Sequence, residues 1–209
     1  MKKINQKELN ILIQNHNLYL NTLIDQDKKG QRLILDEVDF TDNDLSNLDF
    51  VETYITSSLF KGNAFKNTNF GGAELYDCIF KDIVFENCNL GKTIFNYAVL
   101  TSSKFYNCNL INLETLETQF EELSFKNCVV DGAFSNCIVK NVIFEECSFV
   151  STEFWQCIIE SLKFSLINKE IDLTKLIKEI NIGTIERPIF INGDKAVEYF
   201  KNKCIMYNI

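Results

Sequence analysis

Large apolar residues recur at every fifth position along most of the chain. The series runs from Leu35 to Val130, loses one residue near the sequence VVDGAF, and restarts at Phe134 to end at Phe164. Within it, only Thr115 is not a large apolar residue. A period of five fits neither the 3.6-residue turn of an α-helix nor the two-residue alternation of a β-strand. The pattern therefore predicts a repeat architecture in place of ordinary helices and strands.

A second series lies two residues before each of these apolar centres and consists mostly of small or modest side chains. Seven of the eight cysteines belong to it: Cys78, Cys88, Cys108, Cys128, Cys137, Cys147 and Cys157. Their spacing explains why FENCNL at 85–90 returns as FYNCNL at 105–110.

The two series together resemble the pentapeptide-repeat family, whose consensus is a small residue, a polar residue, Leu or Phe, and two variable positions. Typical units are TNFGG (68–72), CNLGK (88–92) and CNLIN (108–112). The resemblance implies an all-β solenoid, a right-handed quadrilateral parallel β-helix in which four units form one square coil and both series point inward. Residues 33–165 would then form about 6.6 coils over ~32 Å at the spacing of paired strands.

The two ends fall outside the repeat, so three parts are expected. Residues 1–32 form an N-terminal helical cap, 33–165 the pentapeptide-repeat β-helix, and 166–209 a small α/β C-terminal module. Asn5 with Glu8 three residues later is typical of a capped helix start. In the C-terminal module we expect a helix over 170–180, a strand over 187–191 and a second helix over 193–203. This module either only caps the solenoid or also forms a homodimer, as C-terminal elements do in some members of the family.

The cysteines allow three interpretations: a metal site, a disulfide framework, or buried thiols. Spacings of nine, ten or twenty residues match no CxxC zinc pattern. Paired parallel strands also rarely provide the torsion that a disulfide requires. We therefore favour buried thiols, which behave as small hydrophobic side chains. Five asparagines that are spaced twenty residues apart are predicted to occupy tight corners: Asn47, Asn67, Asn87, Asn107 and Asn127.

No arrangement of residues typical of catalysis is visible. His16 is the single histidine and lies in the predicted N-terminal helix, so no Ser/His/Asp or Cys/His set can be built. We predict a protein that is not an enzyme, with no catalytic residue, no cofactor and no metal. Because neither a long apolar segment nor a signal peptide is visible, we expect a cytoplasmic protein without membrane contact.

The net charge of −8 argues against direct nucleic-acid binding, which requires a basic surface. The acidic excess lies in the repeat, so an acidic rod that binds a protein is the favoured function, with its partner unknown. Two groups of residues could contribute the partner surface: the acids Asp36, Asp39, Asp42 and Asp44, and the apolar residues Tyr54, Tyr76, Tyr97, Leu116 and Trp155.

The resemblance suggests an alternative. Some pentapeptide-repeat proteins mimic duplex DNA, bind DNA gyrase or topoisomerase IV, and protect these enzymes from quinolones or toxins. Two features weigh against it here: the repeat has no inserted loop, and its acids cluster near its start. The simplest explanation of the acidic excess is solubility.

Overall fold

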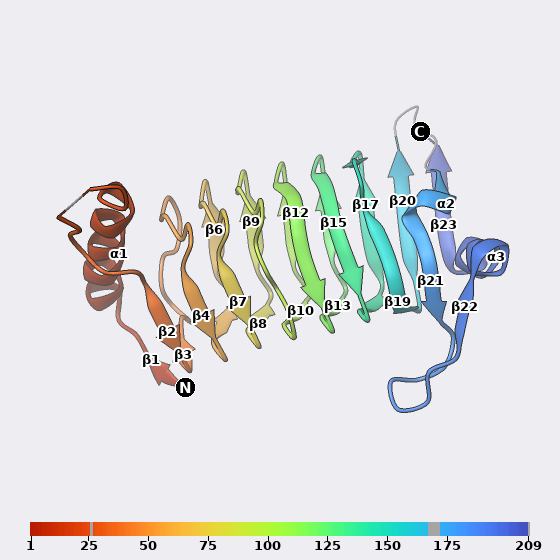
Figure 1. Ribbon diagram of the computed structural model, residues 1–209, viewed down its shortest axis with the longest axis horizontal. Helices are drawn as coiled ribbons and strands as arrows, with labels where there is room; N and C mark the ends of the chain where they lie inside the picture. Colours follow the sequence, from red (N-terminus) through yellow and green to blue (C-terminus); the bar gives the residue numbers. More distant parts are fainter. Residues whose placement is uncertain (26, 167–171, 209) are drawn as a thin grey trace.

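The protein is a β-solenoid of about seven turns, described by a computed structural model over residues 1–25, 27–166 and 172–208. Its coils stack along the long axis of the molecule (Figure 1). Helix α1 (Gln6–Asn21) lies at the N-terminal end and helix α3 (Gly193–Lys203) at the C-terminal end. The predicted all-β solenoid of pentapeptide repeats is confirmed.

The four sides of successive coils stack into four faces, numbered in chain order from Leu35. Face 1 contains β2 (Ile34–Asp36), β4 (Tyr54–Thr56), β7 (Glu74–Tyr76), the later parts of β12 (Asn109–Leu116) and β15 (Val129–Ser135), the first part of β19 (Glu153–Ile159), and β21 (Ile177–Asn181). Face 2 contains β3 (Val38–Asp39), β5 (Leu59–Lys61), β8 (Ile79–Lys81), β10 (Val99–Thr101), β13 (Gln119–Glu121), β16 (Ile138–Lys140) and the end of β19.

Face 3 contains β6 (Ala64–Lys66), β9 (Val84–Glu86), β11 (Lys104–Tyr106), β14 (Ser124–Lys126), β17 (Val142–Glu145), β20 (Leu162–Leu166) and β23 (Cys204–Asn208). Face 4 is built from bridges that join Asp49, Asn69, Asn89 and Asn109, from the first parts of β12 and β15, and from β18 (Ser148–Phe149). All pairings within the repeat are parallel, as the stacking of identical coils requires.

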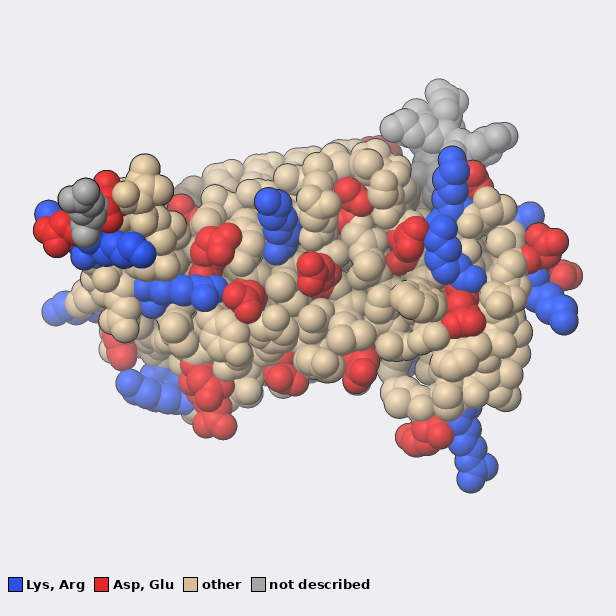
Figure 2. Space-filling view, viewed as in Figure 1, with Lys and Arg blue, Asp and Glu red and all other residues tan. Residues whose placement is uncertain are grey.

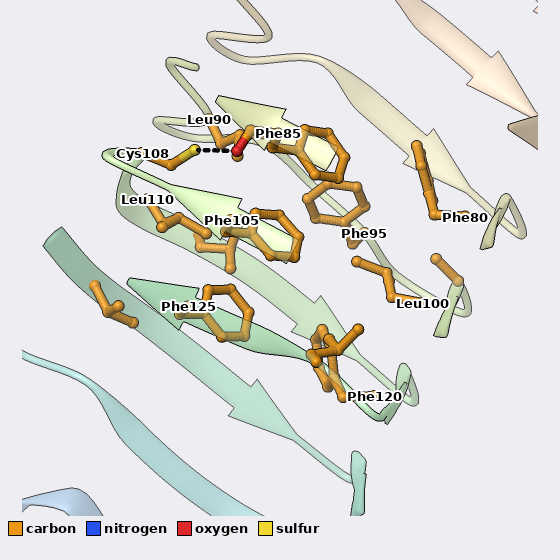
Figure 3. Packing of buried hydrophobic residues seen from close by; sticks show 14 of the residues in the cluster. Phe80, Phe85, Leu90, Phe95, Leu100, Phe105, Cys108, Leu110, Phe120 and Phe125 are labelled. Atoms are coloured by element: carbon orange, nitrogen blue, oxygen red, sulfur yellow. Dashed lines mark hydrogen bonds between the residues drawn. The ribbon is translucent and has the colours of Figure 1, made fainter. Parts of the chain in front are cut away.

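The strand register places equivalent centres above one another. On face 3, Phe105 pairs with Phe85 on one side and with Phe125 on the other. Their rings stack with centroids 4.5 Å and 4.4 Å apart, so they form the predicted aromatic column inside the coil (Figure 3). Thr115, the exception in the apolar series, still points inward and is buried, and its hydroxyl donates to the carbonyl of Ala133 at 3.1 Å.

Most corners share one backbone conformation. Among the described residues, every non-glycine residue with positive φ lies two positions after an inward centre. Asn and Asp tolerate this left-handed region better than other side chains do. The predicted Asn column occupies one line of corners, where Asn107 donates to Asn87 at 3.1 Å and Asn87 donates to Asn67 at 3.4 Å. The corner role of these asparagines is therefore confirmed.

The lost residue near VVDGAF shortens one coil. Strands β12 and β15 pair through the corner between face 4 and face 1, and their register shifts between Leu110 and Leu113. Here Leu113 pairs with Gly132, and a Cβ at position 132 would lie 2.3 Å from the Leu113 carbonyl oxygen. A glycine is therefore required where the shortened coil meets the preceding one.

The N-terminal cap combines a strand and a helix. Strand β1 (Lys2–Lys3) pairs with β3, and α1 begins after Asn5, whose side chain accepts from the backbone N–H of Glu8 at 2.9 Å, as predicted. Leu9 and Ile13 are buried against the first coil.

The C-terminal part differs from the prediction. The helix expected over 170–180 is only partly correct: α2 covers Leu173–Leu176, and from Ile177 the chain continues as β21. Positions 170 and 171 of that prediction lie outside the described residues. Since β21 pairs with β19, backbone pairing with the last coil overrides the helical spacing of its apolar residues.

The rest of this part is closer to expectation. The short strand β22 (Phe190–Asn192) is antiparallel to β21 and overlaps the predicted strand at 187–191, and α3 matches the predicted helix over 193–203. Strand β23 was not predicted and pairs with β20. Phe200 of α3 contacts Phe154 and Phe164 at centroid distances of 6.4 Å and 6.2 Å, which closes the end of the core.

Candidate interaction surface

The cysteines of the small inward series are core residues. All seven are buried free thiols, and each Sγ lies within hydrogen-bond distance of the carbonyl of a centre residue in the preceding coil. Cys108, for example, donates to Phe85 at 3.6 Å (Figure 3). Burial raises the pKa of Cys78 to about 12, which keeps that thiol protonated and unreactive. The interpretation of the series as packing is confirmed.

The four acids proposed from the sequence do not form one surface. Asp36 lies on face 1, Asp39 on face 2, Asp42 at the corner after face 2, and Asp44 on face 3. A step of five residues turns the chain to the next side of the square, so only residues one full coil apart lie together.

Most of these acids also have local partners. Asp39 accepts from the Thr41 backbone N–H at 2.8 Å, and hydrogen bonds from the Thr41 side chain and backbone lower the pKa of Asp39. Asp42 pairs with Lys3 at 2.7 Å, and Asp44 accepts from the Ser46 backbone N–H at 3.0 Å. Their clustering in the sequence therefore reflects turns and the N-terminal cap more than a shared binding site.

The apolar group does come together. Tyr54, Tyr76, Leu116 and Trp155 project from face 1, and Tyr97 lies at the corner that ends it. With Ile94, which bridges Glu74 and Glu114 on the same face, they form what we call the aromatic stripe. The rings of Tyr54 and Tyr76 lie 5.8 Å apart, whereas Tyr97 and Trp155 are 44% and 54% exposed.

Polar contacts hold this stripe in place. Trp155 Nε1 donates to Glu179 Oε2 at 3.3 Å, and Gln156 donates to the same oxygen at 2.6 Å. At the other end Arg32 forms an ion pair with Glu74 at 2.8 Å. Partial burial, together with the nearby Glu74 carboxylate, raises the pKa of Tyr76, so its hydroxyl stays neutral.

Sequence reasoning missed Glu179 as a neighbour of Trp155. Glu179 lies on β21, in the segment expected to be helical, and faces Trp155 only because β21 pairs with β19. No periodic signal in the sequence indicates that pairing.

A groove of about 420 Å³ lies beside the stripe, between face 2 and the β21–β22 hairpin. Ile138 and Ile158 of the solenoid line it together with Ile185, Pro188 and Phe190 of the hairpin. The sequence did not predict this groove, because its second wall depends on where the hairpin lies.

The face seen in Figure 2, drawn from the same side as Figure 1, carries acids and bases interspersed among uncharged residues. Within 1–25, 27–166 and 172–208, no group of three or more His, Cys, Asp or Glu residues is arranged to hold a metal ion. None of the helices in these ranges is long and apolar enough to cross a membrane.

Known proteins with solved structures are similar to this chain. Among solved structures, the chain is similar to QnrB1, a plasmid-mediated fluoroquinolone resistance protein, at 15% identity over 73% of this chain and 94% of that one, with a TM-score of 0.39. It is also similar to HetL, a pentapeptide-repeat protein involved in heterocyst differentiation regulation in the cyanobacterium Nostoc, at 13% identity over 80% of this chain and 91% of that one, with a TM-score of 0.26. No curated protein matches significantly.

The model of the pentapeptide repeat region matches residues 60–133 and 98–172, which together span more than half of the chain. The matched residues carry the inward centres, the small inward series and the left-handed corners described above. The chain therefore belongs to the pentapeptide-repeat family.

Proposed function

We propose that the chain is a non-catalytic scaffold that binds a protein partner through the aromatic stripe of face 1. The observation that carries this proposal is the placement of Tyr54, Tyr76, Tyr97, Leu116 and Trp155 along one side of the stacked coils. Exposed Tyr and Trp side chains are enriched at protein interfaces because they bury a large area at little cost in conformational entropy.

Charge favours a basic partner. Acids on face 1 outnumber bases: its strands carry Asp36, Glu74, Glu114, Glu153 and Glu179 against Lys178, while Arg32 and Lys92 lie along the corner where the face begins. Lys178 pairs with Glu153 at 3.3 Å and Arg32 with Glu74, which leaves Asp36, Glu114 and Glu179 outside these ion pairs. A lysine- or arginine-bearing surface would find apolar anchors and complementary charge on the same face.

Differential affinity purification tests this proposal. A Tyr97→Ala/Trp155→Ala variant should lose the proteins that the wild type retains, because truncating a central aromatic anchor costs about 2 kcal/mol or more. A Tyr106→Ala/Val150→Ala variant, altered on faces 3 and 4, is the matched control and should retain them. If the two variants lost the same proteins to the same extent, face 1 would not be the binding surface.

DNA mimicry is the second candidate. The acids at the start of the repeat lie on different faces and mostly accept local hydrogen bonds, which weighs against a continuous phosphate-like array. Addition of the protein to a gyrase supercoiling assay, with and without a quinolone, tests it directly. Inhibition, or protection from the drug, at micromolar protein would support mimicry, and no effect would exclude it.

The C-terminal module supports a further proposal, that it also forms a homodimer. The β21–β22 hairpin exposes Ile182, Ile185, Ile189 and Phe190 at 41%, 66%, 57% and 44%. A cluster of this kind on a solvent-exposed hairpin is typical of a contact surface. Light scattering tests this: a dimer should be observed that Ile185→Lys/Phe190→Lys converts to a 24.2 kDa monomer, whereas a wild-type monomer would exclude it.

A further inference from the structure

The only histidine of the chain is a buried connection between the N-terminal helix and the solenoid. His16 lies in the third turn of α1, outside the repeat, and its side chain is fully buried. Solvent-exposed positions on the same helix, such as Gln14, were available for a histidine without this constraint. Its burial therefore calls for a physical explanation.

Both ring nitrogens of His16 have backbone partners in the first coil. The N–H of Leu33 donates to Nδ1 at 3.1 Å, so Nδ1 is the unprotonated nitrogen. Nε2 must then carry the proton, and it donates to the carbonyl oxygen of Val51 at 2.7 Å. This arrangement accepts only the neutral imidazole, because a proton on Nδ1 would face another N–H group.

The two partners lie at different places in the coil. Leu33 immediately precedes β2 on face 1, whereas Val51 follows the Asp49 bridge on face 4. His16 thus joins the later half of α1 to both sides of the corner that opens the solenoid. Close backbone contact surrounds this connection: a Cβ at Gly30 would lie 2.3 Å from the carbonyl oxygen of Asn15.

The first half of the cap is attached independently. Strand β1 pairs with β3, Gln6 exchanges two hydrogen bonds with the backbone of Asp44 at 2.7 Å and 3.0 Å, and Lys3 pairs with Asp42. None of these contacts involves a histidine. Loss of the His16 bonds would leave α1 tethered at its start and free at its end.

We propose that α1 is a proton-sensitive cover of the first coil, which protonation of His16 releases. The charged and titratable groups around the ring are Asp49 and Arg32 of the solenoid and Tyr19 of α1, whose ring lies 6.1 Å away. Asp49 favours the charged imidazole and Arg32 opposes it. Release of the later half of α1 uncovers Ile13 and the apolar end of the stack, which becomes available to another chain.

The direction of the effect follows from burial. Desolvation is the main influence and lowers the pKa of His16 from its ordinary 6.5, although the Val51 hydrogen bond opposes it. The docked helix therefore binds fewer protons than the released one. Docking is at full strength above pH 6.5 and weakens as the pH falls below that value.

Nuclear magnetic resonance of the single histidine tests the first step. The imidazole nitrogens should show the Nε2–H tautomer at pH 7.5, and protonation should occur below pH 6.5. Observation of the Nδ1–H tautomer, or protonation at or above 6.5 while the helix stays docked, would overturn the proposal.

Hydrogen exchange followed by mass spectrometry tests the release. After correction for the intrinsic exchange rate, protection in residues 6–21 should fall by up to tenfold per pH unit below pH 6.5, as one linked proton requires. Protection in residues 79–101, inside the repeat, should not change. Unchanged protection in 6–21 while the histidine protonates would contradict the mechanism.

Two variants separate protonation from helix composition. In His16→Gln the amide can still donate to Val51 but cannot ionise, so protection in residues 6–21 should lose its dependence on pH. Adding Gln14→His to that variant places an exposed histidine on the same helix and should not restore the dependence. If either variant showed the wild-type fall in protection, His16 would not be the group responsible.

Discussion

The small inward residues combine a size limit with a hydrogen bond. Thr93 and Thr118 donate to the carbonyls of Phe70 and Phe95 at 2.9 Å and 2.7 Å, and Cys108 makes the equivalent contact to Phe85. Cys and Thr can therefore substitute for each other in this series, since both fit beside a large centre and both offer a donor. This accounts for the cysteine content of the repeat without metal or redox chemistry.

Substitutions at Cys108 test this explanation. Cys108→Thr should change the free energy of unfolding by less than about 1.5 kcal/mol, because size and donor are retained. Cys108→Leu should destabilise by about 1–3 kcal/mol through overpacking. Denaturant unfolding measures both, and equal effects of the two substitutions would contradict the size limit.

Substitutions at the corner residue Asn107 test the cost of its left-handed backbone conformation. Asn107 has a φ of +52° and donates to Asn87. Asn107→Val should destabilise the protein by about 1–3 kcal/mol, because a β-branched residue is strained in the left-handed region. Asn107→Gly should cost less, since glycine adopts this conformation freely. A thermal melt that ranks the glycine variant below the valine variant would exclude backbone strain as the cause.

At the scale of elements, the coils follow from the repeat, but the irregular coil and both ends do not follow from it alone. The Leu113–Gly132 contact absorbs the missing residue. The expected helix over 170–180 gives way to a strand from Ile177 onward because β19 offers an unpaired edge to Ile177 and its neighbours. Local apolar spacing could not predict that outcome, since Leu173, Leu176, Ile177 and Ile180 fit a helix equally well.

The close contact in the shortened coil predicts how glycine substitutions change the melting temperature. Gly132→Ala should lower the melting temperature more than Gly62→Ala does. A methyl group at 132 meets the Leu113 backbone, whereas at 62 it meets nothing within 4 Å and costs only the strain of a φ of +70°. The strain at Gly62 amounts to about 1 kcal/mol. Equal melting temperatures would mean that the backbone near Leu113 relaxes freely.

At the scale of the whole molecule, the stack is nearly one-dimensional. Each coil pairs only with the coils next to it, so a local change should affect its neighbours and leave distant coils intact. The two ends are the exceptions, because each covers a coil that has a neighbour on one side only. Stability at the ends therefore depends on α1 and α3.

Phe200→Ala tests this independence. Removal of the ring from its contacts with Phe154 and Phe164 should cost about 3–5 kcal/mol locally. Hydrogen exchange should increase in residues 153–166 and stay unchanged in residues 54–81. A uniform increase along the chain would show that the solenoid unfolds as one cooperative unit.

The sequence by itself determined the inside of this protein. A five-residue period in large side chains, with small ones two positions earlier, is satisfied by a square coil, and burial then assigns every inward residue. It also located the residues of the aromatic stripe. Tertiary structure alone decided what the outside brings together: the dispersal of Asp36, Asp39, Asp42 and Asp44 over different faces, the approach of Glu179 to Trp155, and the burial of His16 between Leu33 and Val51. The physical reason is that close packing restricts the interior at every position, whereas surface contacts arise between segments whose relative placement no local pattern encodes.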